Sequence, residues 1–163
     1  MKYFAYGSNM YTDRLKKRVP SAATDTVAVL PQYVLRWHTI GEDGSGKCNV
    51  FFTGNPDDAV YGVVFEIPDS DIGLLDEAEG AGYERKTVIV ETNVGAAQAD
   101  AYKAIPDAID DNMKPYVWYR DLVLAGAREH GFSAEYTDLI ENQEVEDDPD
   151  PGRAAQNRRI LGE

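Results

Sequence analysis

Two short stretches of the sequence have residues that could bind an anion and transfer a proton. The first, YFAYGSNM, covers residues 3–10 and changes from a strand-like pattern to a turn at Gly7-Ser8-Asn9. Gly7 lets another group approach the backbone closely, and consecutive N–H groups ahead of a helix form a concave donor site. The turn therefore predicts a site for an oxyanion or a carboxylate. The structural alternative is that Asn9 only caps the following helix.

The second stretch, DSDIGLLDEAEG at residues 69–80, has the periodicity of a short amphipathic helix. Its apolar face is defined by Ile72, Leu74, Leu75 and Ala78. Glu79 falls at the edge of that face, and Glu77 points to the opposite side. The negative end of the helix dipole and burial both disfavour a charged carboxylate there. We therefore expect a raised pKa for Glu79, in the range that is useful for proton transfer.

Glu79 also has a structural interpretation, in which it pairs with Arg85 or Lys86, or reaches solvent at a frayed helix end. If the functional interpretation holds, an anion-receiving turn and a partly buried carboxylic acid indicate acid–base chemistry on a small anionic substrate.

The glycine-rich stretch GEDGSGKC, residues 41–48, has the spacing of a phosphate-binding loop up to Lys47. However, Cys48 stands where a Ser or Thr should meet magnesium, and the residues after it form a strand pattern where a helix is required. The stretch is better interpreted as a flexible hairpin or as a loop at the rim of an active site. His38 and His130 lack the partners of a triad or a zinc site, and His130 suits the negative end of a helix dipole.

These residues must be positioned by a mixture of strands and helices. Strand patterns occupy Lys2–Tyr6, Thr26–Thr39, Asn49–Thr53, Val60–Ile67, Arg85–Thr92 and Gln98–Lys103. Pro31 is expected to bend the second of these or to mark an edge. Helical patterns occupy Thr12–Arg18, the segment from a Ser70 cap to Gly80, Lys114–Arg128, and the segment from a Ser133 cap to about residue 142. We expect Asn49–Thr53 and Val60–Ile67 to pair as a hairpin. Strands come first and long helices last, which indicates an α+β fold with a largely antiparallel sheet.

Composition limits the classes of function. The 163 residues suit one domain, here residues 1–142, followed by an acidic, mobile tail at 143–163. The net charge of −13 should repel nucleic acid and anionic membranes, and no segment is apolar enough to span a bilayer. One cysteine permits neither an internal disulfide nor a cysteine-based metal cluster. We expect a soluble, cytoplasmic protein.

Several motifs, in order, resemble those of the gamma-glutamylcyclotransferase family within the wider AIG2-like and BtrG-like group. YFAYGSNM is similar to the family's N-terminal Tyr-Gly-Ser-Asn signature, and LDEAEG at residues 75–80 is similar to its Leu-Asp-x-x-Glu-Gly motif. RVPSAA, VYGVVFEI and YRDLVLAGAREHG also resemble family segments. The likeness spans about residues 2 to 142.

The resemblance implies a small mixed, mostly antiparallel β-barrel flanked by helices, with Glu79 as the catalytic residue. The substrate-binding residues that it implies are Tyr3, Phe4, Ala5, Tyr6, Gly7, Ser8, Asn9, Tyr83 and Tyr119. The implied reaction is attack of the substrate's own α-amine on its γ-carbonyl, which releases 5-oxoproline and an amino acid or amine. It needs neither a metal nor a cofactor. The implied partner is a small γ-glutamyl compound, and a homodimer is left open.

Two alternative functions stay open. One is a cyclotransferase for γ-glutamylamines or for a γ-glutamyl protecting group in a biosynthetic pathway. The other is a non-catalytic binding protein on the same scaffold, which would use the acidic surface or tail to contact a basic partner.

Overall fold

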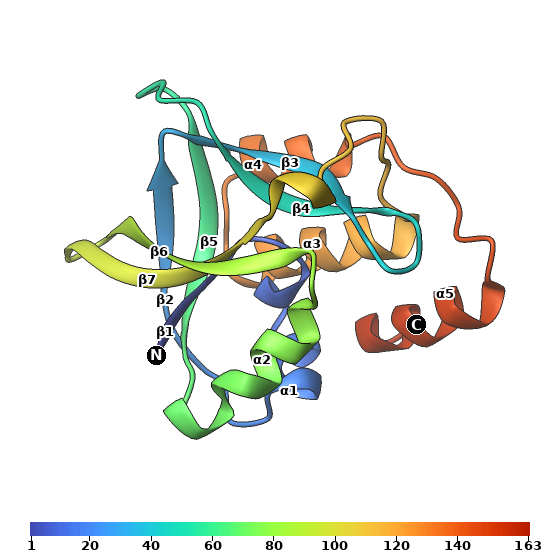
Figure 1. Ribbon diagram of the computed structural model, residues 1–163, viewed down its shortest axis with the longest axis horizontal. Helices are drawn as coiled ribbons and strands as arrows, with labels where there is room; N and C mark the ends of the chain where they lie inside the picture. Colours follow the sequence, from blue (N-terminus) through green and yellow to red (C-terminus); the bar gives the residue numbers. More distant parts are fainter.

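A closed barrel of five strands forms the body of the protein, which a computed structural model describes over residues 1–163 (Figure 1). The strands, in barrel order, are β1 (Lys2–Ala5), β5 (Ala59–Glu66), β2 (Ala23–Pro31), β6 (Tyr83–Thr92) and β7 (Gly95–Ala104). All neighbours are antiparallel except β1 and β7, whose parallel contact closes the barrel. The predicted α+β class and the small, mostly antiparallel barrel are confirmed.

The short strand β1 is almost entirely apolar because it lies between β5 and β7 and is covered on both sides. Phe4 is completely buried, and its ring lies against Gly62 of β5, where an added Cβ would come within 2.5 Å of the ring. Burying an aromatic side chain of this size is worth about 1.5–3 kcal/mol. The packing of Phe4 therefore requires a glycine at position 62. Strand β1 is followed closely by the turn at residues 7–9.

A separate two-stranded sheet, β3 (Tyr33–Ile40) with β4 (Gly46–Phe52), lies beside the barrel (Figure 1). The predicted segment Thr26–Thr39 is divided into two strands at Pro31, where a bend or an edge is expected, because the chain turns through Gln32, which has a φ of 68°. The predicted hairpin between Asn49–Thr53 and Val60–Ile67 is wrong. β4 pairs with β3, and β5 instead lies between β1 and β2, where both of its faces are covered.

Helices pack around the barrel, and two of them frame the candidate site. The helices are α1 (Thr12–Arg18), α2 (Ile72–Glu79), α3 (Val117–Glu129), α4 (Ala134–Glu141) and α5 (Pro151–Arg158), with 3₁₀ turns η1 (Ser8–Met10), η2 (Asp69–Asp71), η3 (Pro106–Ala108) and η4 (Arg159–Leu161). The Ser133 cap is confirmed, since its side chain accepts the Tyr136 N–H. The Ser70 cap is wrong: residues 69–71 form η2, and α2 starts at Ile72. Helices α1 and α2 lie side by side (Figure 1).

The segment after residue 142 differs from the predicted mobile tail, because it contains α5 and contacts α3 (Figure 1). Asp150 caps α5 by accepting the Arg153 N–H, and Pro151 occupies the first turn, where its missing N–H costs nothing. The side chain of Asp148 is fully buried and accepts hydrogen bonds from Trp118 Nε1 at 2.8 Å and from Arg153. These polar contacts hold a segment that has few apolar residues. None of the helices has the length and apolar character that crossing a membrane requires.

Candidate active site

A cavity of about 400 Å³ opens between the turn after β1, the end of α2, the β3–β4 loop and the first turn of α3. Its size is within the usual range of small-molecule sites, roughly 300–1,000 Å³. Polar, charged and aromatic residues form much of its lining, among them Tyr3, Tyr6, Gly7, Ser8, Asn9, Arg14, Arg18, Asp43, Lys47, Cys48, Glu79, Tyr83, Trp118 and Tyr119. Both stretches in which the sequence indicated chemistry therefore reach one cavity.

Glu79 is half-buried in the last turn of α2, and its carboxylate points toward the turn that follows β1. Glu79 Oε1 accepts hydrogen bonds from Asn9 Nδ2 at 3.0 Å and from the Tyr3 hydroxyl at 3.2 Å. Asn9 Nδ2 also donates to the Tyr3 hydroxyl at 3.1 Å. Gly80, with a φ of 79°, ends the helix directly after Glu79. The carboxylate is thus fixed by two side chains from the β1 segment.

Burial raises the pKa of the Glu79 carboxyl above its ordinary value. The positive charge of Arg18, the Tyr3 hydrogen bond and the charge of Arg14 oppose this rise, because each favours the ionised form. The expected raised pKa is therefore confirmed in direction, with burial as the dominant cause. The structural alternative for Glu79 is wrong, since Arg85 pairs with Asp76, and Lys86 pairs with Glu84.

The backbone N–H groups of Gly7, Ser8 and Asn9 have no acceptor within the protein, while the carbonyls of Gly7 and Ser8 accept bonds within η1. Gly7 packs so closely that an added Cβ would lie 3.1 Å from Cys48 Cβ and 3.3 Å from the Tyr119 hydroxyl. A side chain at position 7 would therefore crowd the cavity wall. The turn keeps the free donors that an anion requires.

Three tyrosines, of which Tyr6 and Tyr119 are buried and Tyr83 is partly buried, contribute to the remaining wall. The Tyr6 hydroxyl donates to the Tyr102 carbonyl, the Tyr83 hydroxyl donates to the Cys48 carbonyl at 2.6 Å, and the Tyr119 hydroxyl accepts the Cys48 N–H at 3.0 Å. Burial raises the pKa of each phenol well above its ordinary value. These side chains are neutral at physiological pH and act through shape and hydrogen bonds.

Two of the predicted site residues do not reach the cavity. Phe4 and Ala5 are buried in the core of the barrel, 0% and 1% exposed, and neither lines the cavity wall. Phe4 packs against β5, so its side chain is committed to the core. The resemblance implied residues 3–9, but of these only Tyr3 and residues 6–9 line the cavity.

The β3–β4 loop is a rim of the cavity, as the sequence indicated, and the phosphate-loop interpretation is wrong. Gly41, Asp43 and Lys47 line the opening, and Lys47 Nζ donates to Asp43 Oδ2 at 2.8 Å. Cys48 lies inside strand β4, so no helix follows the loop. His38 and His130 lie outside the cavity, and no cluster of three or more His, Cys, Asp or Glu side chains is placed to hold a metal ion.

Two cationic residues at the cavity were missed from the sequence, Arg14 and Arg18, whereas Lys47 belongs to the rim loop that the sequence indicated. Arg18 Nη1 donates to Asn9 Oδ1 at 3.0 Å, and this orients the amide that holds Glu79. Arg14 Nε donates to Ser8 Oγ at 2.9 Å. The i, i+4 spacing of the two arginines on α1 was the available signal, because it places them on one helix face.

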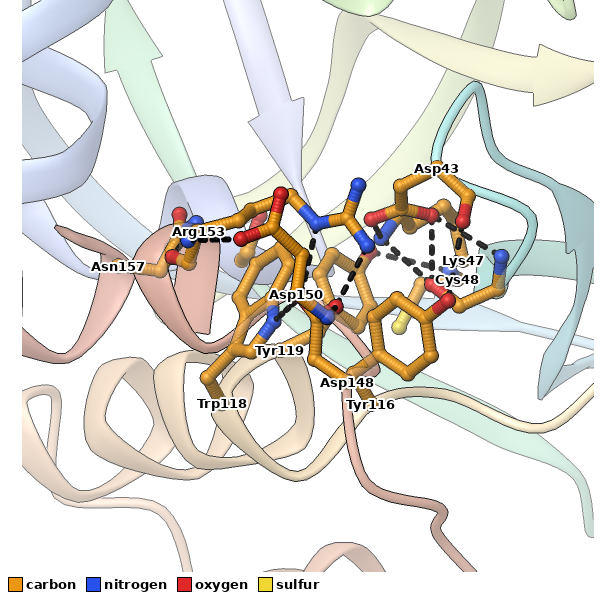
Figure 2. A network of polar contacts seen from close by, with 12 residues as sticks. Asp43, Lys47, Cys48, Tyr116, Trp118, Tyr119, Asp148, Asp150, Arg153 and Asn157 are labelled. Atoms are coloured by element: carbon orange, nitrogen blue, oxygen red, sulfur yellow. Dashed lines mark hydrogen bonds and ion pairs between the residues drawn. The ribbon is translucent and has the colours of Figure 1, made fainter. Parts of the chain in front are cut away.

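A polar network continues from the cavity wall to α5 (Figure 2). Lys47 Nζ lies 4.5 Å from the ring centre of Tyr119 and 4.7 Å from that of Trp118. Trp118 Nε1 then donates to Asp148, which Arg153 also contacts. The C-terminal segment is thus connected to residues that face the cavity.

The comparisons with known proteins agree with one another. The family model described as the AIG2-like family matches residues 59–140. The chain is 30% identical over 154 residues to a human protein named gamma-glutamylcyclotransferase, covering 89% of this chain and 79% of that protein. A bovine protein of the same name is 31% identical over 158 residues, with the same coverage. A solved structure titled gamma-glutamyl cyclotransferase superposes with a TM-score of 0.87 at 28% identity, covering 100% of this chain and 99% of the other.

Proposed function

The chain belongs to the AIG2-like family together with the gamma-glutamylcyclotransferases, and we propose that it releases 5-oxoproline from γ-glutamyl compounds, with Glu79 transferring the protons. The observation that carries the assignment of Glu79 is its position. Its carboxyl group has a raised pKa and lies in the same cavity as the free backbone N–H groups of Gly7, Ser8 and Asn9. Glu79 Oε1 also lies 3.0 Å from the side-chain nitrogen Nδ2 of Asn9.

The reaction starts when the Glu79 carboxylate removes a proton from the α-ammonium group of the substrate. The freed amine attacks the γ-carbonyl carbon of the same molecule, a new C–N bond closes a five-membered ring, and the carbonyl oxygen becomes an oxyanion. Ring closure within one molecule benefits from the large effective concentration of the attacking group. The protein therefore needs no nucleophile of its own, which accounts for a cavity with neither an activated Ser nor a reactive Cys.

Collapse of the tetrahedral intermediate breaks the bond to the departing nitrogen. The attacking nitrogen changes from NH₃⁺ to a lactam N–H and loses two protons, and the departing nitrogen gains two as it leaves as a protonated amine. One carboxyl group between the two nitrogens is sufficient to transfer them, which is worth about 10²–10⁴-fold in rate. The N–H groups of residues 7–9 stabilise the oxyanion or hold the glutamyl carboxylate.

The reaction class is tested with two substrates that differ only at the α-amine. γ-Glutamyl-alanine should give 5-oxoproline and alanine, and its N-acetyl derivative should be inert, because the acylated nitrogen cannot close the ring. In ¹⁸O-water the 5-oxoproline should carry no label. Release of alanine from the N-acetyl compound, or labelled product, would indicate hydrolysis and contradict the proposal.

A further inference from the structure

Arg14 is a buried cation without an anionic partner. Arg14 is 8% exposed and lines the cavity. It takes part in none of the ion pairs of the chain. Its two hydrogen-bond acceptors are neutral oxygens, Ser8 Oγ at 2.9 Å and Asn157 Oδ1 at 3.2 Å. A buried charge left unpaired is costly, so a binding site is where such a group is retained.

The guanidinium of Arg14 has donors to spare. It carries five N–H groups, and the two contacts above use one on Nε and one on Nη1. No fully enclosed side-chain nitrogen in the chain lacks a partner, so Nη2, which has no protein acceptor, is not fully enclosed, and Arg14 is one of the residues that line the cavity. The free edge has the fork geometry that matches a carboxylate.

The other two cations differ from Arg14 in pairing or in burial. Lys47 is paired with Asp43 at 2.8 Å. Arg18, which donates to Asn9 Oδ1, is only partly buried, so water lowers the cost of its charge. Burial and the nearby charge of Arg18 lower the pKa of Arg14 to about 10, which leaves it protonated at neutral pH. Of the three cations, Arg14 is therefore the one that is both buried and without an ion pair.

We propose that Arg14 binds a carboxylate of the substrate, and that Asn157 on α5 is the positioning residue that holds the guanidinium in place. This inference rests on the proposed function. It identifies the recognised chemical group, a carboxylate, which the substrate carries on its glutamyl α-carbon and, where an amino acid is the leaving group, on that amino acid as well.

The contact with Asn157 gives the C-terminal segment a role at the site. Helix α5 is anchored by Asp148, whose buried carboxylate accepts bonds from Trp118 and Arg153. Asn157 is itself fixed, because its Nδ2 donates to the Arg153 carbonyl at 2.9 Å. Asn157 Oδ1 is therefore presented to Arg14 from a rigid base.

Three substrates separate the two carboxylates. γ-Glutamyl-alanine carries both, γ-glutamyl-ethylamine lacks that of the leaving group, and 4-aminobutanoyl-alanine lacks that of the glutamyl unit and closes to 2-pyrrolidinone. We expect Arg14→Met to lower kcat/KM about 10- to 100-fold more for every substrate that keeps the recognised carboxylate than for the substrate without it. Arg14→Lys, which keeps the charge and loses the fork, should fall in between.

Controls make the outcome decisive. Lys17→Met removes an exposed charge from the same helix and should change none of the three rates. Thermal unfolding of each variant establishes that it is folded. An equal loss on all three substrates, or no loss on any, would overturn the inference, because binding of one carboxylate must affect the substrates unequally.

Asn157→Ala should lower the preference for the recognised carboxylate about fivefold, as expected for the loss of one orienting hydrogen bond. Gln156→Ala, an exposed amide truncated on the same helix, is the matched control and should leave the preference unchanged. A purely structural effect of Asn157 would reduce all rates together. An unchanged preference in Asn157→Ala would refute the positioning role.

Calorimetry separates this inference from the proposed function. Binding of the three compounds is measured to Glu79→Gln and to the double variant with Arg14→Met, which requires no turnover. Carboxylate-dependent binding that disappears with Arg14, in a protein whose wild type forms no cyclic product, would support Arg14 and refute the function. Turnover with binding that is indifferent to Arg14 would refute the inference and leave the function in place.

Discussion

Gly126→Ala should destabilise the protein although alanine is the better helix former. Gly126 lies in the last turn of α3, where that helix packs against η1. An added Cβ would come within 2.7 Å of Met10 Cβ and 2.7 Å of the Tyr11 backbone nitrogen. Because one of these neighbours is backbone, relief requires that α3 and η1 move apart.

The magnitude follows from two opposing effects. Replacing Gly by Ala inside a helix gains about 0.5–1 kcal/mol, and overpacking a close contact costs about 1–3 kcal/mol. With backbone in the way, the cost should lie at the upper end, so we expect a net loss of about 1–2 kcal/mol in the free energy of unfolding. For a chain of this length that corresponds to a melting temperature lower by roughly 2–8 °C.

Urea unfolding and a thermal melt measure the loss, and 5-oxoproline release reports the displacement of η1, which carries Ser8 and Asn9. Gly73→Ala is the matched control, because Gly73 is also helical and an added Cβ there meets nothing within 4 Å. That variant should be stabilised by about 0.5–1 kcal/mol. A Gly126→Ala protein as stable as the wild type would refute the packing argument.

Three further predictions concern pH, the C-terminal segment and the thiol. Burial raises the pKa of Glu79 and the charge of Arg18 opposes it, so Arg18→Met should move the acidic limb of the kcat/KM profile to higher pH; an unmoved limb would contradict the coupling. Hydrogen bonds hold the pKa of Asp148 far below its usual range, so its stabilisation is fully present above about pH 4 and is lost as the pH falls. Asp148→Asn should thus be less stable at pH 7 in urea unfolding, with a smaller deficit in acid, and an equal deficit at both would count against this. Burial raises the pKa of Cys48 to about 12, so a disulfide reagent at pH 8 should label it only through unfolding, and fast labelling of the folded protein would disprove its protection.

The residues proposed to do the chemistry could be predicted from the sequence, because their placement depends on residues close to them in the chain. Periodicity alone placed Glu79 at the edge of an apolar helix face, and the break from strand to turn at Gly7 marked the donors. Helix α1, the turn between β6 and β7, and the Ser133 cap were predictable for the same reason, since each depends on neighbouring residues.

The parts that sequence reasoning missed depend on distant contacts. Strand β5 pairs along its two edges with β1 and β2, and nothing near Val60–Ile67 signals this pairing. Helix α5 has few apolar residues and is held by one buried carboxylate, so composition suggested a tail. The contacts of Arg14 could not be predicted either, because Asn157, which accepts a hydrogen bond from it, lies 143 positions away in the chain. The predicted cytoplasmic location and a homodimer stay predictions.

The role of Glu79 is tested most directly by the rate of 5-oxoproline formation from γ-glutamyl-alanine in Glu79→Gln, with Glu91→Gln as an exposed control. The substitution keeps the shape of the side chain and removes its ability to accept a proton. We expect a loss of about 10²–10⁴-fold in kcat with the melting temperature little changed, and full activity in the control. Turnover by Glu79→Gln within tenfold of the wild type would contradict the assignment of proton transfer to this carboxylate.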